Sequence, residues 1–556
     1  MERAAAESLL DGRALTADTV ALMADGALRP AVPPTALDAM ERSRQAAQKL
    51  AADGARVYGR STGVGAHRGQ EVEDHDGAGH DLRLLLSHAG GIGTPLPARQ
   101  VRAMMVVRIN QLLAGGSGLR PEIASALVGA VRAGVHPEVH EYGAVGTGDL
   151  TALAQLGLTL YGHAAWRESG GGATLPVPLR LERGDVLPLL SSNALTLGQA
   201  ALACHDLGTL LRAAHVVAAL SLYAVDGSLE AYAADVHRAR PHPAIGRAAA
   251  RVRRLLGVAG TTAGTTAGTT AGATAGLPGM RSPDSVPDPA LRSALDPELD
   301  SALDPVPDTR VQDPFAFRCF PQAHGPALEA WAGLGDVLAI DLNSAAENPL
   351  IGWDDATGAP VAHHHGGFFA APLTLALDRL GLAVLGTARL SAARLSGLGR
   401  PELTGLRSFL ADGASAGSGL MILEYGATAA LAELQTGATP AGLGHAVLSH
   451  GMEEAASFAT QAARKTLRLA DAYRLVLGCE LVAAVRALRQ RGTAPDPATP
   501  AGHAYALAAA ALDPDMADRP LTKDVTRAAE LLDGFARLGE SAEFGEPAEP
   551  GESAQA

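Results

Sequence analysis

Long Ala- and Leu-rich segments, in which apolar residues recur at steps of three and four, constrain the fold of this chain more than any other feature. This spacing places the apolar side chains on one face of an α-helix. The last segment is longer than an ordinary globular helix, which is typical of a bundle of long helices. Little of the sequence alternates with period two, so we expect a mainly α protein without a large sheet. The segments are residues 37–52, 121–133, 198–224, 372–397, 419–436 and 455–491.

Two stretches interrupt the helical pattern. Residues 259–276 repeat Ala, Gly and Thr, and the residues that follow to about 310 are rich in Pro and Asp. The repeat has no large apolar side chain, so it cannot offset the entropy that ordering would cost. We interpret residues 258–310 as a disordered insertion, with a Thr-rich binding segment as the alternative. The predicted domains are residues 1–197 with the candidate site loops, residues 198–257 and 311–491 as the helical bundle, and residues 492–556 as a C-terminal helix with an acidic, disordered tail.

Charge and composition exclude several classes of function. The net charge is −14 at pH 7, whereas a protein that follows a nucleic acid backbone needs a basic face. No uninterrupted apolar run approaches the ~20 residues of a membrane-spanning helix, and the N-terminal residues lack the apolar region of a signal peptide. The three cysteines fit neither a disulfide framework nor a zinc site. We expect a cytoplasmic enzyme, or a relative of one, that binds neither nucleic acid nor membranes.

Two glycine-rich turns carry polar side chains that a plain connection does not need. The first begins at Tyr58, with Arg56 and Arg60 beside it in the sequence. A tyrosine near cations can act as a base, although a packed surface tyrosine is the simpler alternative. The second contains His88, which follows a run of leucines. A histidine in that setting is more often a buried, hydrogen-bonded residue than a catalyst.

The turn Gly146-Thr147-Gly148 precedes Asp149 and has two interpretations. It can be a tight turn followed by an aspartate that caps a helix. Alternatively, the glycines on both sides of Thr147 can let a backbone amide reach a nearby carbonyl and react with it.

In their order along the chain, these motifs resemble the histidine and phenylalanine ammonia-lyase family, and the histidine ammonia-lyase form above all. The Tyr58 loop is similar to Y-G-x-N-T-G-x-G, and residues 86–93 are similar to S-H-A-x-G-x-G. The resemblance runs from about residue 20 to 490. Further matches are residues 108–118 with R-x-N-x-L-x-x-G-x-S-G, Asn193 with a catalytic-site Asn, residues 312–322 with Q-D-x-Y-S-x-R-C-x-P-Q, residues 343–350 with N-S-A-T-D-N-P-L, residues 417–422 with S-G-F-M-I, and residues 452–454 with Q-E-D.

The resemblance implies a mainly α fold of the aspartase/fumarase type, with a central bundle of long helices. It implies a homotetramer whose active sites are completed by several subunits, and a small amino-acid-like substrate that loses ammonia. Tyr58 would take the β-proton, Asn193 would orient the carboxylate or a developing charge, and Arg318 would hold the carboxylate in a bidentate fork. The implied catalytic residues are Tyr58, Gly146, Thr147, Gly148, Asn193 and Glu453, and the implied substrate-binding residues are His88, Gln312, Phe315, Arg318 and Phe368.

The sequence departs from the family at its electrophile, a methylidene-imidazolone made from Ala-Ser-Gly. Gly146-Thr147-Gly148 stands in its place and the loop is one residue shorter. Thr147 could cyclise and dehydrate, but the alkene would carry an extra methyl group that crowds the carbon to be attacked. We therefore expect no methylidene-imidazolone and no other cofactor. Phe315 also lacks the hydroxyl of the family's Tyr, and residues 366–370 replace G-N-F-H-G.

Three adjacent histidines, His363 to His365, invite a metal site. They cannot all face one ion from a regular strand or helix, so we expect them to line the mouth of the pocket and predict no bound metal. Arg318 and Glu453 have a structural alternative as an ion pair in the bundle.

Two functions are consistent with these residues. The first is a lyase that eliminates ammonia from histidine or an aromatic amino acid, or a related elimination without the usual electrophile. The second is an inactive relative that binds an amino acid or acts as a scaffold. The polar residues kept at Tyr58, Asn193, Arg318 and Glu453 favour the first, and the changes at Thr147 and Phe315 favour the second.

Overall fold

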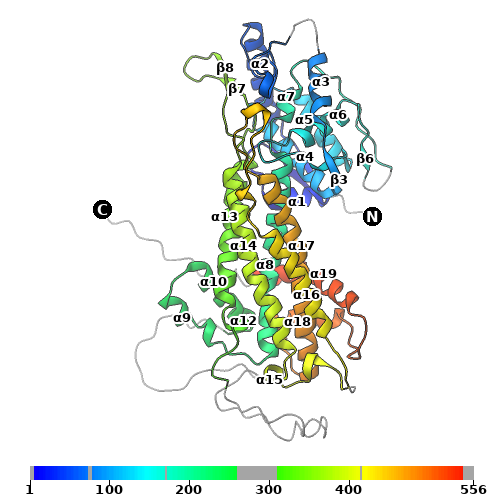
Figure 1. The fold of residues 1–556 in the computed structure, drawn as a ribbon, viewed down its shortest axis with the longest axis vertical. Coiled ribbons are helices and arrows are strands. Elements are labelled where there is room, and N and C mark those ends of the chain that lie inside the picture. The colour runs from blue at the N-terminus through cyan, green and yellow to red at the C-terminus, as the bar shows by residue number, and fades with distance from the viewer. Residues whose placement is uncertain (1–5, 73–77, 169–171, 259–309, 414–415, 542–556) are drawn as a thin grey trace, which may run out of the picture. The chain divides into compact units, whose positions relative to one another are not determined.

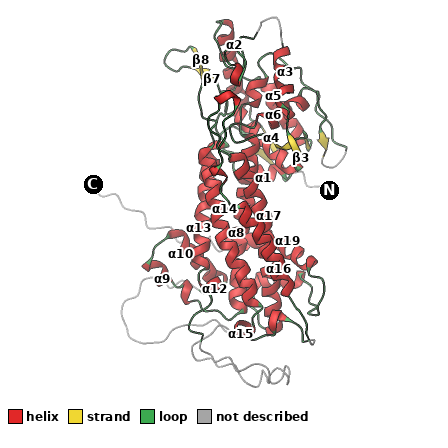
Figure 2. Cartoon of the chain, in the orientation of Figure 1, coloured by secondary structure: helices red, strands yellow, loops and turns green. Residues whose placement is uncertain are grey.

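Helices dominate the fold, which was obtained as a computed structural model. The structure describes residues 6–72, 78–168, 172–258, 310–413 and 416–541. In these ranges the strands are short and form four two-stranded sheets (Figure 2). The prediction of a mainly α protein without a large sheet is confirmed. Residues 259–309, on which the predicted insertion falls, and the tail after 541 lie outside the described residues.

The chain divides into two compact units, each discontinuous in sequence. The first comprises Met1–Asp206, Trp331–Gly381 and Ala438–Arg468, and the second comprises Leu207–Ala330, Leu382–Gly437 and Leu469–Ala556. The division falls inside four long helices: α8 (Ala194–Ala224), α13 (Phe320–Asp341), α14 (Ala371–Leu398) and α17 (Ala459–Arg491). The predicted domain boundaries at 197 and 491 stay predictions.

The first unit surrounds α4 (Ala98–Leu113), which is buried from Ala103 onwards. The sheets pair β1 (Ala6–Leu9) with β2 (Leu28–Ala31) in parallel, and β3 (Ile92–Pro95) with β5 (His140–Tyr142), β4 (Val135–His136) with β6 (Arg167–Glu168), and β7 (Leu350–Trp353) with β8 (Pro360–His363) antiparallel. The remaining helices of this unit are α1 (Ala17–Ala24), α2 (Pro34–Ala52), α3 (Gly79–His88), α5 (Pro121–Arg132), α6 (Leu150–Leu160) and α7 (Val186–Leu190).

The second unit contains the remaining parts of the four long helices together with shorter ones. The apolar residues of α8 lie on all sides of the helix, as expected for a helix that is buried all round. The shorter helices are α9 (Ala234–Ala239), α10 (Pro243–Leu255), α12 (Phe315–Arg318), α15 (Pro401–Thr404), α16 (Met421–Gly437), α18 (Pro500–Ala511) and α19 (Thr522–Ser541) (Figure 1).

A fully buried ion pair joins three long helices in the second unit. Glu480 on α17 is 0% exposed, and its Oε1 accepts from Arg394 Nε of α14 at 2.6 Å. Its Oε2 accepts from Arg394 Nη2 at 2.8 Å. The hydroxyls of Ser221 and Ser391 donate to the same carboxylate at 2.7 and 2.5 Å. Both oxygens are therefore hydrogen-bonded twice, which is what a charge needs when it is removed from water.

Two buried histidines pack against each other in the same unit. His215 on α8 and His324 on α13 lie edge to face, with ring centroids 4.3 Å apart. The ring nitrogens of His324 lie 3.0 Å from Thr387 Oγ1 and from Leu211 O. Burial lowers the pKa of His324 to about 3 and holds the pKa of His215 well below its usual value. Both side chains are therefore neutral in the folded protein at neutral pH.

This pair predicts a loss of stability in acid. Each histidine has a pKa of about 6.5 in the unfolded chain, so below that pH the unfolded state binds more protons than the folded state. Each should therefore lower the free energy of unfolding by about 1.4 kcal/mol per pH unit, from 6.5 down towards the folded pKa. Urea unfolding at pH 7, 6 and 5 measures this slope. His324→Gln should reduce the slope, whereas His242→Gln, which changes an exposed histidine, should leave it unchanged.

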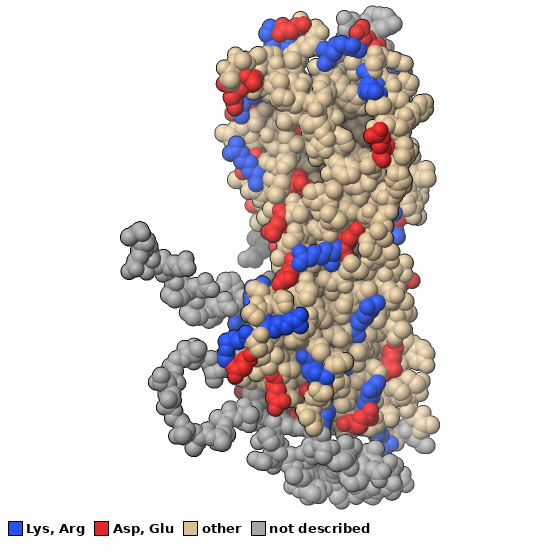
Figure 3. Space-filling model, turned by 60° about the vertical axis from the view of Figure 1, so that its left-hand side comes forward, with Lys and Arg blue, Asp and Glu red and all other residues tan. Residues whose placement is uncertain are grey.

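Two helical stretches are long and apolar enough to cross a membrane by length and composition. They are Val186–Ala224 and Ala371–Leu398, and 89% and 50% of their apolar windows are buried inside the protein. Core helices of soluble proteins pass the same test, so this is weak evidence for a membrane. On the face seen in Figure 3, basic and acidic side chains are interspersed, and no extended basic patch is visible there. A cytoplasmic location stays a prediction.

Candidate active site

Tyr58 stands at the start of a tightly closed loop that follows α2. Its phenolic oxygen accepts a hydrogen bond from the Gly65 backbone N–H at 2.8 Å. Gly65 has a φ of +56°, and a Cβ there would lie 2.9 Å from Ser449 Oγ. The Ser449 turn is closed by backbone hydrogen bonds between Leu448 and Glu453, at 2.9 and 3.2 Å. The structure therefore places the Tyr58 loop next to the turn that precedes Glu453.

Arg60 anchors the base of this loop. Its Nη2 donates to Ser117 O at 3.0 Å and to Gly118 O at 3.1 Å. Desolvation lowers the pKa of Arg60 to about 10, and the charges of Asp81 and Asp185 offset part of this effect. Arg60 is thus a structural tie between two glycine-rich segments. The sequence placed Arg60 near Tyr58 as a neighbouring cation, but its hydrogen bonds go to Ser117 and Gly118, and the Gly65 N–H is the donor to the Tyr58 oxygen.

The turn at residues 146–148 is held against the start of α17. The Ser457 hydroxyl donates to Gly146 O at 2.7 Å. Gly146 has a φ of +85° and Gly148 a φ of +136°. A Cβ on Gly146 would lie 2.3 Å from Ser457 Oγ and 2.6 Å from Ala459 N, so this position requires glycine.

These three residues do not fit a methylidene-imidazolone. Loss of water from a serine leaves a CH₂ alkene, whereas Thr147 would keep its methyl group. Cyclisation would require the Gly148 nitrogen to attack the carbonyl carbon of Gly146, and in the structure the oxygen of that carbonyl accepts the Ser457 hydrogen bond. The arrangement is that of a stable, hydrogen-bonded turn.

Asp149 links this turn to the start of α8. Its carboxylate is fully buried and accepts from the Thr196 backbone N–H at 2.8 Å and from Thr196 Oγ1 at 2.9 Å. Its own N–H donates to Ser192 O at 2.8 Å. Burial raises the pKa of Asp149 to about 6. Asp149 stands at the N-cap position of α6, but its side chain makes no cap there and binds the first turn of α8.

Asn193 precedes α8 and is 8% exposed. Its Nδ2 donates to Phe368 O at 2.7 Å. Its Oδ1 is buried and has no hydrogen-bond partner among the residues that the structure describes. A buried acceptor without a partner is costly, so this oxygen is available to a ligand. Phe368 itself is half-buried and contributes its carbonyl to this contact.

The other predicted site residues have different surroundings. His88 ends α3, and its Nδ1 lies 2.9 Å from Leu84 O and 3.0 Å from Ser87 Oγ, so it is used within its own helix. Gln312, Phe315 and Arg318 belong to the second unit, where the Arg318 guanidinium lies 4.4 Å from the centre of the 66%-exposed Phe315 ring.

The sequence did not identify several of the residues that build the site. Ser457 and Asp149 act through partners about 300 and 50 positions away, so no local pattern marks them. Glu347, which forms a buried ion pair with Arg108 at 2.9 Å, lies within residues 343–350, the segment that resembles N-S-A-T-D-N-P-L. The position of Glu347 within that motif is the sequence feature that could have identified it as a site residue.

Within the described residues, no group of three or more His, Cys, Asp or Glu side chains is arranged to hold a metal ion. Of the adjacent histidines, His364 accepts a hydrogen bond from the Tyr58 backbone N–H at 3.3 Å, and His365 binds backbone groups.

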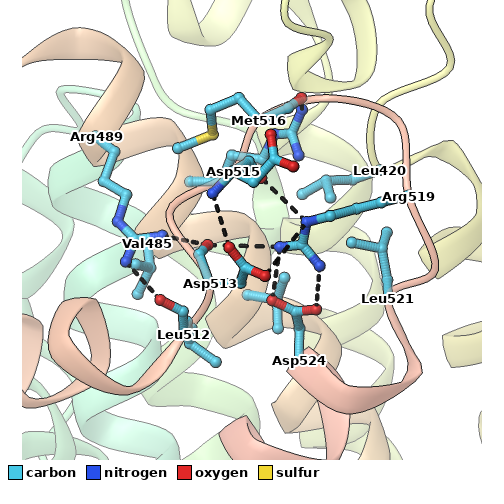
Figure 4. Close-up of a pocket in the computed structure, with 12 residues that line it drawn as sticks. Leu420, Val485, Arg489, Leu512, Asp513, Asp515, Met516, Arg519, Leu521 and Asp524 are labelled. Carbon is cyan, nitrogen blue, oxygen red and sulfur yellow. Dashed lines mark hydrogen bonds and ion pairs between the residues drawn. The ribbon is translucent and has the colours of Figure 1, made fainter.

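A small hollow in the second unit lies between α17 and the segment that follows α18 (Figure 4). Its arginines are already engaged by the protein. Arg489 donates to the carbonyls of Ala509, Leu512 and Asp513, and Arg519 forms a bidentate pair with Asp524 at 2.7 and 3.0 Å. The side chains around the hollow therefore bind one another and join α17 to the segments that carry the C-terminal helices.

The fold and these motifs define a lyase. The family model of aromatic amino acid lyases matches residues 15–510, and the chain belongs to this family. It is 32% identical over 542 residues to a histidine ammonia-lyase of Anaeromyxobacter dehalogenans, covering 94% of this chain and 98% of that one. It is 31% identical over 538 residues to the histidine ammonia-lyase of Streptomyces coelicolor, with 94% and 95% covered.

Solved structures show the same fold. The tyrosine aminomutase of Streptomyces globisporus superposes with a TM-score of 0.80 at 25% identity, covering 98% of this chain and all of that one. The histidine ammonia-lyase of Trypanosoma cruzi gives 0.79 at 24%, with 99% of each chain covered. The ergothioneine-degrading enzyme ergothionase of Treponema denticola gives 0.78 at 23%, with 96% and 99% covered. The predicted family and fold are confirmed.

Proposed function

We propose that the protein is a carbon–nitrogen lyase that eliminates an amine from histidine or an aromatic amino acid, and that it works without a methylidene-imidazolone. The observation that carries the proposal is the buried Asn193 with its unpartnered Oδ1, kept beside a Gly146 turn in which Thr147 stands in place of the serine of the usual electrophile. An inactive scaffold is not favoured, because it would have no need for a desolvated acceptor of this kind.

The reaction needs a base and a fixed substrate carboxylate. The phenolic oxygen of Tyr58 removes the β-proton of the substrate, and the electrons of that C–H bond form the new double bond. The C–N bond breaks and the amine leaves with its electron pair. Asn193 orients the substrate through Oδ1, and Arg318, contributed by a partner subunit, holds the carboxylate. Glu453 and His88 would face the aromatic or imidazole ring.

The usual electrophile activates the amine for departure. Without it, the amine must already be a good leaving group. A primary ammonium group can lose its charge by deprotonation, whereas a quaternary ammonium group cannot and departs as a neutral amine. We therefore propose a quaternary ammonium derivative of a histidine-like amino acid as the second candidate substrate. The similarity in fold to an ergothioneine-degrading enzyme supports including it.

An intact-mass measurement followed by a substrate comparison tests the proposal. We expect the purified chain to have the mass of the unmodified sequence. We also expect elimination from Nα-trimethylhistidine to be faster than from histidine, phenylalanine or tyrosine, followed by the absorbance of the conjugated acid. A mass lower by two water molecules would contradict the cofactor-free mechanism. Failure of all four substrates would contradict the lyase.

We also propose a homotetramer, supported by apolar side chains that α16 leaves exposed. Ile422 and Tyr425, which share one face of this helix, are 61% and 65% exposed. Light scattering is expected to give the mass of four chains. Replacing both residues with lysine should give a smaller species, whereas Lys523→Glu, an exposed charge change on α19, should not. A single-chain mass for the wild type would refute this assembly.

A further inference from the structure

We propose that residues 364–368 are a positioning segment that holds Tyr58 and Asn193 together, with His364 as the positioning residue for Tyr58. This inference rests on the proposed function, since it concerns how the proposed base is held. The segment is hydrogen-bonded to both candidate catalytic residues, although they lie 135 positions apart in the sequence.

The first contact is made by His364. The Tyr58 backbone N–H donates to His364 Nε2 at 3.3 Å. The contact therefore uses the lone pair of Nε2 as the acceptor. This contact acts on the backbone at Tyr58, while the phenolic oxygen is held separately by Gly65. His364 thus fixes the backbone position from which the Tyr58 side chain extends.

The second contact is made at the other end of the segment. The Phe368 carbonyl accepts from Asn193 Nδ2 at 2.7 Å. This hydrogen bond fixes which end of the amide is the donor, and so it fixes the direction of the unpartnered Oδ1. The same segment therefore sets the position of the proposed base and the orientation of the proposed substrate acceptor.

His365 makes the segment rigid between these contacts. Its N–H donates to Asn348 Oδ1 at 2.9 Å, its Nε2 donates to Glu347 O at 2.8 Å, and its Nδ1 accepts from the Gly367 N–H at 2.9 Å. Glu347 is in turn held by the buried guanidinium of Arg108. Because none of these hydrogen bonds uses the His364 ring, a change at His364 can release Tyr58 without releasing Asn193.

Hydrogen–deuterium exchange combined with steady-state kinetics tests this role. His364→Ala is expected to speed exchange of the peptide that covers residues 55–65, and to lower kcat by at least about fivefold, as expected for loss of one hydrogen bond. KM should change less than twofold. His364→Gln, whose Oε1 can accept from the same N–H, should restore both exchange and kcat. His363→Ala is the matched control for exchange, because His363 is exposed at the end of β8.

Unchanged exchange in His364→Ala would overturn the proposal, and so would faster exchange with kcat retained. Failure of the Gln variant to restore kcat would point to a loss of folding rather than of positioning, and would overturn it as well. The wild type is assayed first, so that an inactive wild type is recognised as a failure of the proposed lyase. In that case the hydrogen–deuterium exchange measurement still decides whether His364 holds the Tyr58 loop.

Discussion

Replacing Tyr58 with phenylalanine is expected to lower kcat for amine elimination by about 10²- to 10⁴-fold, the range typical for loss of a general base. The variant keeps the ring and loses the oxygen that would take the β-proton. It also loses the hydrogen bond from Gly65 to that oxygen, which is 2.8 Å long in the structure. Binding of the substrate carboxylate does not depend on this oxygen, so KM should change much less than kcat.

Two controls separate catalysis from folding in this experiment. Tyr505→Phe removes a hydroxyl in the second unit and should leave kcat within about twofold of the wild type. The melting temperature of Tyr58→Phe should stay close to that of the wild type, because one partly exposed hydrogen bond contributes only about 1 kcal/mol. A Tyr58→Phe variant that retains full kcat would rule out Tyr58 as the base.

Replacing Glu480 with alanine is expected to lower the free energy of unfolding by about 3–5 kcal/mol, the cost of breaking a buried ion pair. The variant leaves Arg394 charged and 1% exposed in the middle of the helices, without the carboxylate that accepts from two of its nitrogens. Ser221 and Ser391 lose their acceptor at the same time. Chemical denaturation followed by circular dichroism measures the change.

The matched control is an exposed pair on α19. Glu530, which pairs with Arg527 at 2.9 Å, is more than half exposed, and Glu530→Ala should cost less than about 1 kcal/mol. The double variant Arg394→Met/Glu480→Met should recover much of the lost stability, because it removes both charges and fills the space. If Glu480→Ala proved as stable as the wild type, the ion pair could not be a source of the rigidity of these helices.

The long helices could be predicted from the sequence, and their ends could not. Residues 455–491 were predicted as one helix, but α17 begins at Ala459, because Phe458 has a φ of +55° and cannot continue a right-handed helix. Residues 419–436 were predicted as a helix from Gly419, whose φ of +50° delays the start of α16 to Met421. Apolar periodicity carries no information about such single backbone angles.

The candidate site was predictable where a residue acts through a local motif. Tyr58 and Asn193 lie in motifs that resemble those of a known family, and the structure places both in the first unit. The partners that orient them were not predictable, because His364 and Phe368 act through a side chain nitrogen and a carbonyl from segments 306 and 175 positions away. A sequence motif can identify a candidate site residue, whereas its hydrogen-bond partners are identified only from the folded structure.

The close contact between Gly146 and the start of α17 also bears on how this chain could evolve. Regaining Ala-Ser-Gly by substitution of residues 146–148 would require a side chain at a position where a Cβ would meet Ser457 Oγ at 2.3 Å and Ala459 N at 2.6 Å. Because one of these neighbours is backbone, a smaller side chain at position 457 would not by itself make room. A path back to the triad by substitution at residues 146–148 therefore has to begin by moving residues 457–459, and a path that begins with an alanine at position 146 passes through a destabilised protein.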